Sequence, residues 1–246
     1  MEYRNNGNRI KLDAEMTAIQ LKASKAMQNI VQVLKSLAIQ VKKPLKTEMK
    51  ESQLTASFVE TFFSALSEYD DCLAYNANVR EDNSCKESYR ADYKIDYYED
   101  GQKKFCNFYG EIKPKKSIKS CRQKIYKDLY KLAIFAREEM KVNNLKMVML
   151  SHIVHNCFNF YLMIDKKQYF GLLHLEQIKI PLSLSGFKFN LEDLIMMHKV
   201  TQVHRSLCFT QTAETARLRI FPYDGVKQLV TKREGRKRKW CATLYE

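Results

Sequence analysis

Four segments of the chain carry apolar side chains at helical spacing, three or four residues apart. They cover about residues 10–42, 50–69, 118–142 and 191–207. In the second segment, Leu54, Phe58 and Phe62 fall on one face, as expected for a helix that packs against a core. The pattern therefore predicts four helices, two of them before any strand.

Other segments favour strands. Between the second and third helices, "YRADYKIDYYEDGQKKFCNFYGEIK" predicts two strands joined by a tight turn at Asp100-Gly101. After the third helix, "KMVMLSHIV", "CFNFYLMID" and "YFGLLHLEQIKI" predict three more. We therefore predict an α/β fold with a mixed central β-sheet flanked by helices. The expected organisation is an N-terminal helical arm over 1–48, a core over 49–181, and a C-terminal helix with a basic tail over 182–246.

Charge narrows the class of partner. The 246 residues include 42 Lys and Arg and 28 Asp and Glu, which leaves a net charge of +14. Such an excess attracts polyanions, of which nucleic acid is the usual one, although a merely basic surface is the alternative. Seven scattered cysteines without a CxxC pair argue against a zinc ribbon and indicate an intracellular protein. The absence of a long apolar run predicts a soluble chain without a membrane partner.

The predicted hairpin brings charged residues together. If Asp100 and Gly101 form a two-residue turn, Asp92 pairs with Tyr109, and Glu111 lies diagonally from Asp92 on the same sheet face. The Cβ atoms of such diagonal neighbours are roughly 7–8 Å apart. Two carboxylates at that spacing can bind one Mg²⁺ ion. We therefore predict a metal site at this end of the hairpin.

The same register places Lys113 near the predicted metal site and Asp96 far from it. Asp96 pairs with Phe105, about 20 Å from Glu111 at ~3.4 Å per residue, and is excluded from the site. Lys113 lies two residues beyond Glu111 on the same face, where an ammonium group can stabilise charge on a phosphate. The alternative is a ladder of weak surface ion pairs along an exposed sheet face.

These residues resemble the PD-(D/E)XK nuclease superfamily, in which an acidic strand residue precedes a strand that ends in Glu-x-Lys. The matching residues are Asp92 and the segment Glu111-Ile112-Lys113, with Ala91 where the family usually has proline. The resemblance covers roughly residues 50–180 and implies a restriction-endonuclease-like αβββαβ core. "GEIKP" followed by "DLYKLA" is also similar to uncharacterised nuclease-like proteins of fungi.

The resemblance implies roles for single residues. Asp92 and Glu111 bind Mg²⁺ or Mn²⁺ as the cofactor, and Lys113 assists the attacking water. Members often add a glutamate from the first helix, and Glu51 fits this role better than Glu60, which points away from the apolar stripe. An N-terminal carboxylate favoured by the helix dipole is the alternative interpretation of Glu51.

Some members place a Gln or Lys of the next helix near the phosphate. In this chain Gln123 and Lys127 lie opposite the apolar stripe, whereas Asp128 and, less well, Lys124 lie nearer its edge. We assign none of them a role.

The remaining candidates are histidines and the basic tail. His152 and His155 point to opposite faces of one predicted strand, so a shared metal is not expected. The tail carries Arg233, Arg236, Lys237, Arg238 and Lys239 beside Trp240. It fits nucleic-acid binding, a nuclear-localisation patch or a solubilising end equally well.

We therefore predict a Mg²⁺-dependent nuclease that hydrolyses phosphodiester bonds of DNA. Two alternatives stay open. One is a nuclease-like module that binds nucleic acid without cutting it, and the other is a protein-interaction or effector domain whose partner surface is formed by the N-terminal helices. Steep salt dependence of DNA binding would count against the latter.

Overall fold

The computed structural model describes residues 9–41, 49–66, 71–77, 90–114, 122–166, 169–183 and 189–210. Its elements follow one another along the chain as α1 (Arg9–Lys22), α2 (Lys25–Gln40), α3 (Glu51–Leu54), the π-helical turn η1 (Thr55–Val59), α4 (Glu60–Leu66), β1 (Cys72–Asn76), β2 (Tyr93–Glu99), β3 (Gln102–Lys113), α6 (Arg122–Asn143), β4 (Met147–Val154), β5 (Cys157–Asp165), β6 (Phe170–Lys179) and α7 (Leu191–Thr210). No helix in these ranges is long and apolar enough to cross a membrane.

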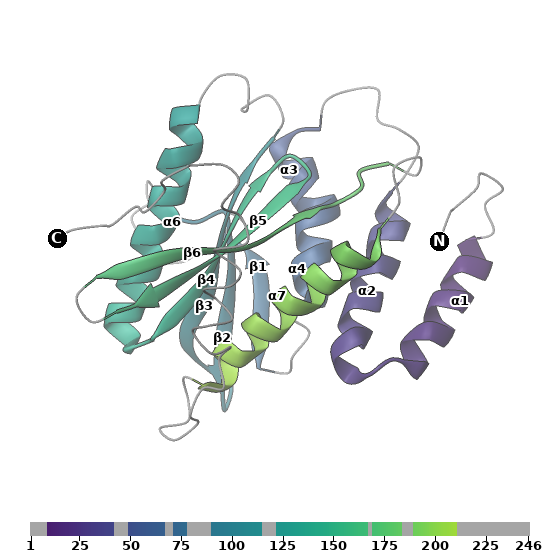
Figure 1. Ribbon diagram of the computed structural model, residues 1–246, viewed down its shortest axis with the longest axis horizontal. Coiled ribbons are helices and arrows are strands. Elements are labelled where there is room, and N and C mark those ends of the chain that lie inside the picture. The colour runs from purple at the N-terminus through teal and green to yellow at the C-terminus, as the bar shows by residue number, and fades with distance from the viewer. Residues whose placement is uncertain are drawn as a thin grey trace.

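The strands form one six-stranded sheet in the order β1-β2-β3-β4-β5-β6 (Figure 1). Strands β3 and β4 are parallel, and every other neighbouring pair is antiparallel. The parallel pair requires a crossover, which α6 supplies. The predicted α/β class with a mixed sheet flanked by helices is therefore confirmed.

Helices cover both faces of the sheet. Helices α2, α4 and α7 lie on one side and α6 on the other (Figure 1). The side of α2, α4 and α7 holds the larger core, in which the Phe63 and Phe108 rings lie 4.7 Å apart. On the other side, Leu132 and Ala136 of α6 pack against Leu150 of β4. Neighbouring residues of β4 alternate between these two cores, as a strand buried on both faces requires.

Two predictions about the N-terminal half need correction. The single helix predicted over 10–42 is two helices, because Ser24 has extended backbone angles and begins α2 afresh. Strand β1 was not predicted. Its five residues "CLAYN" are only partly buried and show no clear alternation, so the strand depends on its pairing with β2. The predicted helices and strands that follow the hairpin agree with the structure to within a few residues.

The hairpin turn is confirmed, but the predicted register is wrong. Asp100 and Gly101 both have positive φ, of 52° and 74°, as a tight primed turn requires. However, Tyr109 pairs with Lys94 and not with Asp92. The cause is two register shifts, each of which leaves one extra residue in β3. Together they shift the pairing of the distal half of the hairpin by two residues, so Asp92 and Glu111 remain on the same face.

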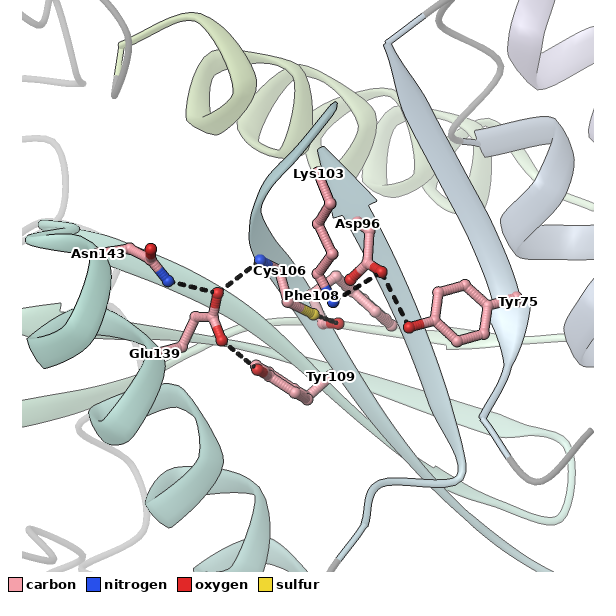
Figure 2. Close-up of polar contacts among 8 residues, drawn as sticks. All are labelled: Tyr75, Asp96, Lys103, Cys106, Phe108, Tyr109, Glu139 and Asn143. Carbon is pink, nitrogen blue, oxygen red and sulfur yellow. Dashed lines mark hydrogen bonds and ion pairs between the residues drawn. The ribbon is translucent and has the colours of Figure 1, made fainter. Parts of the chain in front are cut away.

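Glu139 of α6 accepts hydrogen bonds from the irregular part of β3 (Figure 2). The carboxylate of Glu139 accepts hydrogen bonds from the Cys106 amide at 2.6 Å, the Tyr109 hydroxyl at 2.8 Å and the Asn143 side chain at 2.8 Å. A bulge breaks the strand ladder locally, so a backbone amide there needs another acceptor. Glu139 therefore attaches α6 to the irregular stretch of β3 and stabilises the register.

Candidate active site

The hairpin brings together Asp92 and Glu111, the two residues predicted to bind the metal. The Asp92 amide donates to the Gly110 carbonyl at 3.0 Å, and the Ile112 amide donates to Asp92 Oδ2 at 2.8 Å. Because Tyr93 pairs with Gly110, one further step of the register sets Asp92 opposite Glu111. The two carboxylates are thus direct neighbours and not the diagonal pair that the simple turn register predicts.

A glycine permits this close strand approach. A Cβ atom at Gly110 would lie 3.1 Å from the Tyr93 Cβ, tighter than an ordinary van der Waals contact. The position precedes Glu111 and faces the residue after Asp92. The small residue therefore helps to bring the two acidic positions together.

Glu111 is a buried carboxylate between two lysines. Its side chain is 1% exposed; Lys131 Nζ contacts Oε1, and Lys113 Nζ lies 3.4 Å from Oε2. Burial, followed by the negative charge of Asp92, raises the pKa of Glu111 to about 7, although both lysines oppose this. Glu111 is therefore held near its ionisation point at neutral pH.

Lys113 lies among several acids. Burial alone would lower its pKa, but the carboxylates of Glu111, Asp92, Asp128 and Glu51 raise it, so that the amine stays protonated. Its Nζ is 3.7 Å from Asp128 Oδ2. The predicted lysine is thus a cation enclosed by carboxylates, and Asp128 of α6 belongs to the same neighbourhood.

Glu51 joins the site from the first turn of α3. Burial raises the pKa of Glu51, the charge of Asp92 raises it further, and Lys113 lowers it. Glu51 is thus within electrostatic range of both residues, although its own side chain is exposed. Glu60 is exposed and acts instead on Tyr93, which belongs to the core on the opposite face of the sheet.

The structure therefore brings six charged side chains together, which we call the acid–lysine cluster. Its members come from α3, the start of β2, β3 and α6, and they are Glu51, Asp92, Glu111, Lys113, Asp128 and Lys131. With all groups ionised, two lysines and four acids give a net charge of 2 − 4 = −2. A negative excess in a partly buried place favours a bound cation.

Sequence reasoning missed Lys131, left Asp128 without a role and considered His152 only as a metal partner of His155. Asp128 lies at the edge of the apolar stripe of α6, and Lys131 follows three residues later on the same flank, a spacing that could have identified it. His152 of β4 pairs with Glu111 across the parallel strands. Burial and then the charge of Lys113 lower the pKa of His152 to about 4, so the imidazole is neutral at pH 7.

The carboxylate oxygens of the cluster suit a hard divalent cation, but lysines contact those of Glu111. Asp92, Glu111 and Glu51 offer oxygen ligands, which Mg²⁺ prefers. Within the described ranges, however, no three His, Cys, Asp or Glu side chains are arranged to hold a metal ion. Both oxygens of Glu111 face lysines instead. A cation at Glu111 would therefore have to displace the Lys131 ammonium.

Other candidates lie apart from the cluster or outside the described chain. Asp96 is buried, accepts a hydrogen bond from Tyr75 at 2.9 Å and pairs with Lys103 at 2.9 Å (Figure 2). Asp96 pairs with Cys106 and not with Phe105 as predicted, and these contacts lie apart from the acid–lysine cluster. His155 lies in the turn after β4, away from the strand position of His152. The basic tail with Arg233, Arg236, Lys237, Arg238 and Lys239, and the Gln123 and Lys124 side chains, lie outside the described residues.

Comparisons with known proteins give no match. No protein-family model, no curated protein and no solved structure matches the chain. Evidence for function therefore comes from the fold and from the acid–lysine cluster.

Proposed function

We propose that the protein is a metal-dependent nuclease of the PD-(D/E)XK type that hydrolyses phosphodiester bonds of DNA. The observation that carries this proposal is the position of Asp92, Glu111 and Lys113 beside one another where β2 and β3 meet, with the charge of Glu51 within electrostatic range. Asp92, Glu111 and Lys113 also carry the family resemblance in the sequence, and Glu51 is the further glutamate that this resemblance implies. The net charge of +14 supports a polyanionic substrate.

The order of the elements also supports the proposal. From α4 onwards the chain runs helix, three antiparallel strands, crossover helix α6, and a strand parallel to β3. This order is similar to the αβββαβ core that the sequence resemblance implies. The cluster lies where the start of β2 meets the end of β3, which matches the motif positions of that family.

Asp92 and Glu111 would hold a Mg²⁺ or Mn²⁺ ion, with Glu51 as a further oxygen donor. Bound there, the ion would polarise a phosphate oxygen and lower the pKa of a coordinated water. The partly buried surroundings strengthen every electrostatic interaction of these carboxylates relative to bulk water.

The two lysines have separate tasks in the proposed reaction. Lys113 is held by the surrounding acids and is 22% exposed, so it can stabilise negative charge that develops on the phosphate. Lys131 contacts Glu111 in the free protein. If Glu111 held a metal ion, the Lys131 ammonium would be free to contact a phosphate oxygen of the substrate.

Cleavage assays with matched variants test the proposal. Asp92→Ala and Glu111→Ala should abolish cleavage of labelled DNA in Mg²⁺ or Mn²⁺, whereas Glu99→Ala, an exposed carboxylate at the hairpin turn, should leave it unchanged. Circular dichroism and melting curves check that the variants fold. The assignment fails if folded Asp92→Ala or Glu111→Ala protein cuts as fast as the wild type.

A second candidate is binding of nucleic acid without cleavage. The observation that favours it is the contact of both Glu111 oxygens with lysines, which neutralises this carboxylate without a metal. A titration with Mg²⁺ and Mn²⁺ separates the two functions. A pure binding module keeps its affinity for DNA in chelator and yields no product at any metal concentration.

A further inference from the structure

A row of polar side chains continues from the acid–lysine cluster across the sheet. Glu111 of β3 pairs with His152 of β4, His152 pairs with Asn159 of β5, and Asn159 pairs with Gln177 of β6. Directly paired residues of neighbouring strands point to the same sheet face. His152, Asn159 and Gln177, which we call the polar row, therefore lie on the face of the cluster.

The members of the polar row are linked and become more exposed toward the edge of the sheet. The Asn159 side-chain amide donates to the His152 carbonyl at 3.1 Å, and the Gln177 amide donates to Asn159 Oδ1 at 2.7 Å. His152 is 2% exposed, Asn159 is half-buried and Gln177 is exposed. The row thus leads from the buried site to solvent.

Two features indicate that the polar row serves a ligand. The first is His152 Nε2, a buried atom without a hydrogen-bond partner in the described chain, in a residue that pairs with Glu111 across the strands. An unsatisfied buried polar atom destabilises a fold, so such atoms are rare unless they have a role. The second is the contrast between faces, because Phe158, Phe160 and Ile178 of the same two strands are fully buried on the other side.

The chemistry of the row fits a nucleotide. Carboxamides present a donor and an acceptor together, which suits base edges and sugar hydroxyls, and an imidazole nitrogen can do either. Lys179 is exposed two residues beyond Gln177 and can contact a backbone phosphate. A neutral, hydrogen-bonding row followed by a lysine is what a single strand requires once it leaves the site of cleavage.

We propose that the polar row binds the nucleotides that flank the scissile phosphate on one side, and so sets the position and the sequence preference of the cut. This inference rests on the proposed nuclease function. The row touches one flank only, because β4, β5 and β6 all lie on the same side of β3 in the sheet.

A substrate series with trimmed ends tests the inference. Oligonucleotides with one cleavable linkage and zero to four nucleotides on either side are compared between the wild type, Gln177→Ala and Asn159→Ser. The matched control is Gln102→Ala, an exposed glutamine at the opposite end of the hairpin. Fluorescence anisotropy in chelator measures the affinity for the same oligonucleotides without cleavage.

The expected result depends on the length of one flank. With the full flank, Gln177→Ala should lower kcat/KM and affinity by about tenfold, the effect of one lost neutral hydrogen bond. With that flank removed, the variant should match the wild type, and Gln102→Ala should match it throughout. His152→Phe should remove the discrimination between bases next to the cut, while His152→Asn should retain part of it.

The outcomes separate the two proposals. If the wild type cleaves DNA but Gln177→Ala and folded Asn159→Ser behave like the wild type, or lose the same factor on every substrate, the inference is overturned and the nuclease function stands. If the wild type cleaves none of the oligonucleotides under any metal condition, the nuclease function fails, and the inference fails with it.

Discussion

The buried carboxylate of Glu111 should make the wild-type protein less stable than the Glu111→Gln variant. Glu111 is 1% exposed and has a pKa raised from 4.5 to about 7, chiefly by burial. The folded state therefore holds a proton there that the unfolded chain has already released. Replacing Glu111 by Gln, which is neutral and of similar size, removes this disadvantage at every pH above the ordinary pKa.

The magnitude follows from the two pKa values. The difference between 4.5 and about 7 corresponds to about 3 kcal/mol, because each pKa unit is worth about 1.4 kcal/mol. The sign is that of an acid whose pKa is raised by folding, so wild-type stability falls as the pH rises from about 4.5 to about 7. Glu111→Gln should thus be stabilised by about 3 kcal/mol at pH 8 and by about 1 kcal/mol at pH 5.

Urea unfolding in the presence of a chelator measures this difference. Wild type and Glu111→Gln are unfolded at pH 5 and pH 8, together with Glu176→Gln as the control. Glu176 also contacts a lysine, Lys199, but that lysine belongs to α7, on the other side of the sheet from the cluster. The control measures the effect of replacing a lysine-paired glutamate outside the cluster by Gln, and Glu111→Gln should be inactive in cleavage.

An equal effect of Glu111→Gln at pH 5 and pH 8 would refute the reasoning. Such a result would mean that the fold does not resist ionisation of Glu111, and that Lys131 and Lys113 compensate for burial completely. A loss of stability at pH 8 would mean that these lysines stabilise the fold through Glu111 by more than its burial costs.

Three other side chains should give measurable effects. Glu139→Ala removes three hydrogen bonds and should lower the free energy of unfolding by about 3 kcal/mol, with the exposed neighbour Glu138→Ala as a neutral control in urea titrations. Burial lowers the pKa of His204 from 6.5 to about 4, so the free energy of unfolding should fall by about 3 kcal/mol as the pH falls through this window. His204→Gln should flatten this dependence of stability on pH, and an unchanged dependence would contradict the prediction. Lys131→Met removes the ammonium that contacts Glu111, so Mn²⁺ affinity in calorimetry should rise while DNA cleavage falls; weaker Mn²⁺ binding would contradict the displacement of Lys131 by the cation.

The sequence predicted the fold well where local patterns were strong. Residue types and spacing within one short segment predict the Asp100-Gly101 turn, the buried strand β4 and the apolar stripe of α6. Strand β1 and the break at Ser24 could not be predicted in this way. An edge strand with partial burial depends on its neighbour for hydrogen bonds, and a single serine within a helical pattern is no strong helix breaker.

The candidate site was predictable only in part, for a related reason. Asp92, Glu111 and Lys113 are joined by a short motif and one hairpin, so their proximity follows from nearby sequence. Lys131 and His152 reach the site through the crossover from β3 by way of α6 to β4. Their positions depend on how α6 packs on the sheet and on the register of β4, and neither is encoded in the spacing of residues.

The register of the hairpin explains why a wrong pairing still predicted that Asp92 and Glu111 are neighbours. Side chains alternate with a period of two, so one extra residue in β3 would have sent Glu111 to the face opposite Asp92. The two extra residues restore the face and bring the acids from a diagonal to a direct pairing. Glu139 stabilises the irregular stretch between them from α6, the same helix that contributes Asp128 and Lys131. The geometry of the acid–lysine cluster is therefore determined by the packing of α6 as much as by the Glu-x-Lys motif itself.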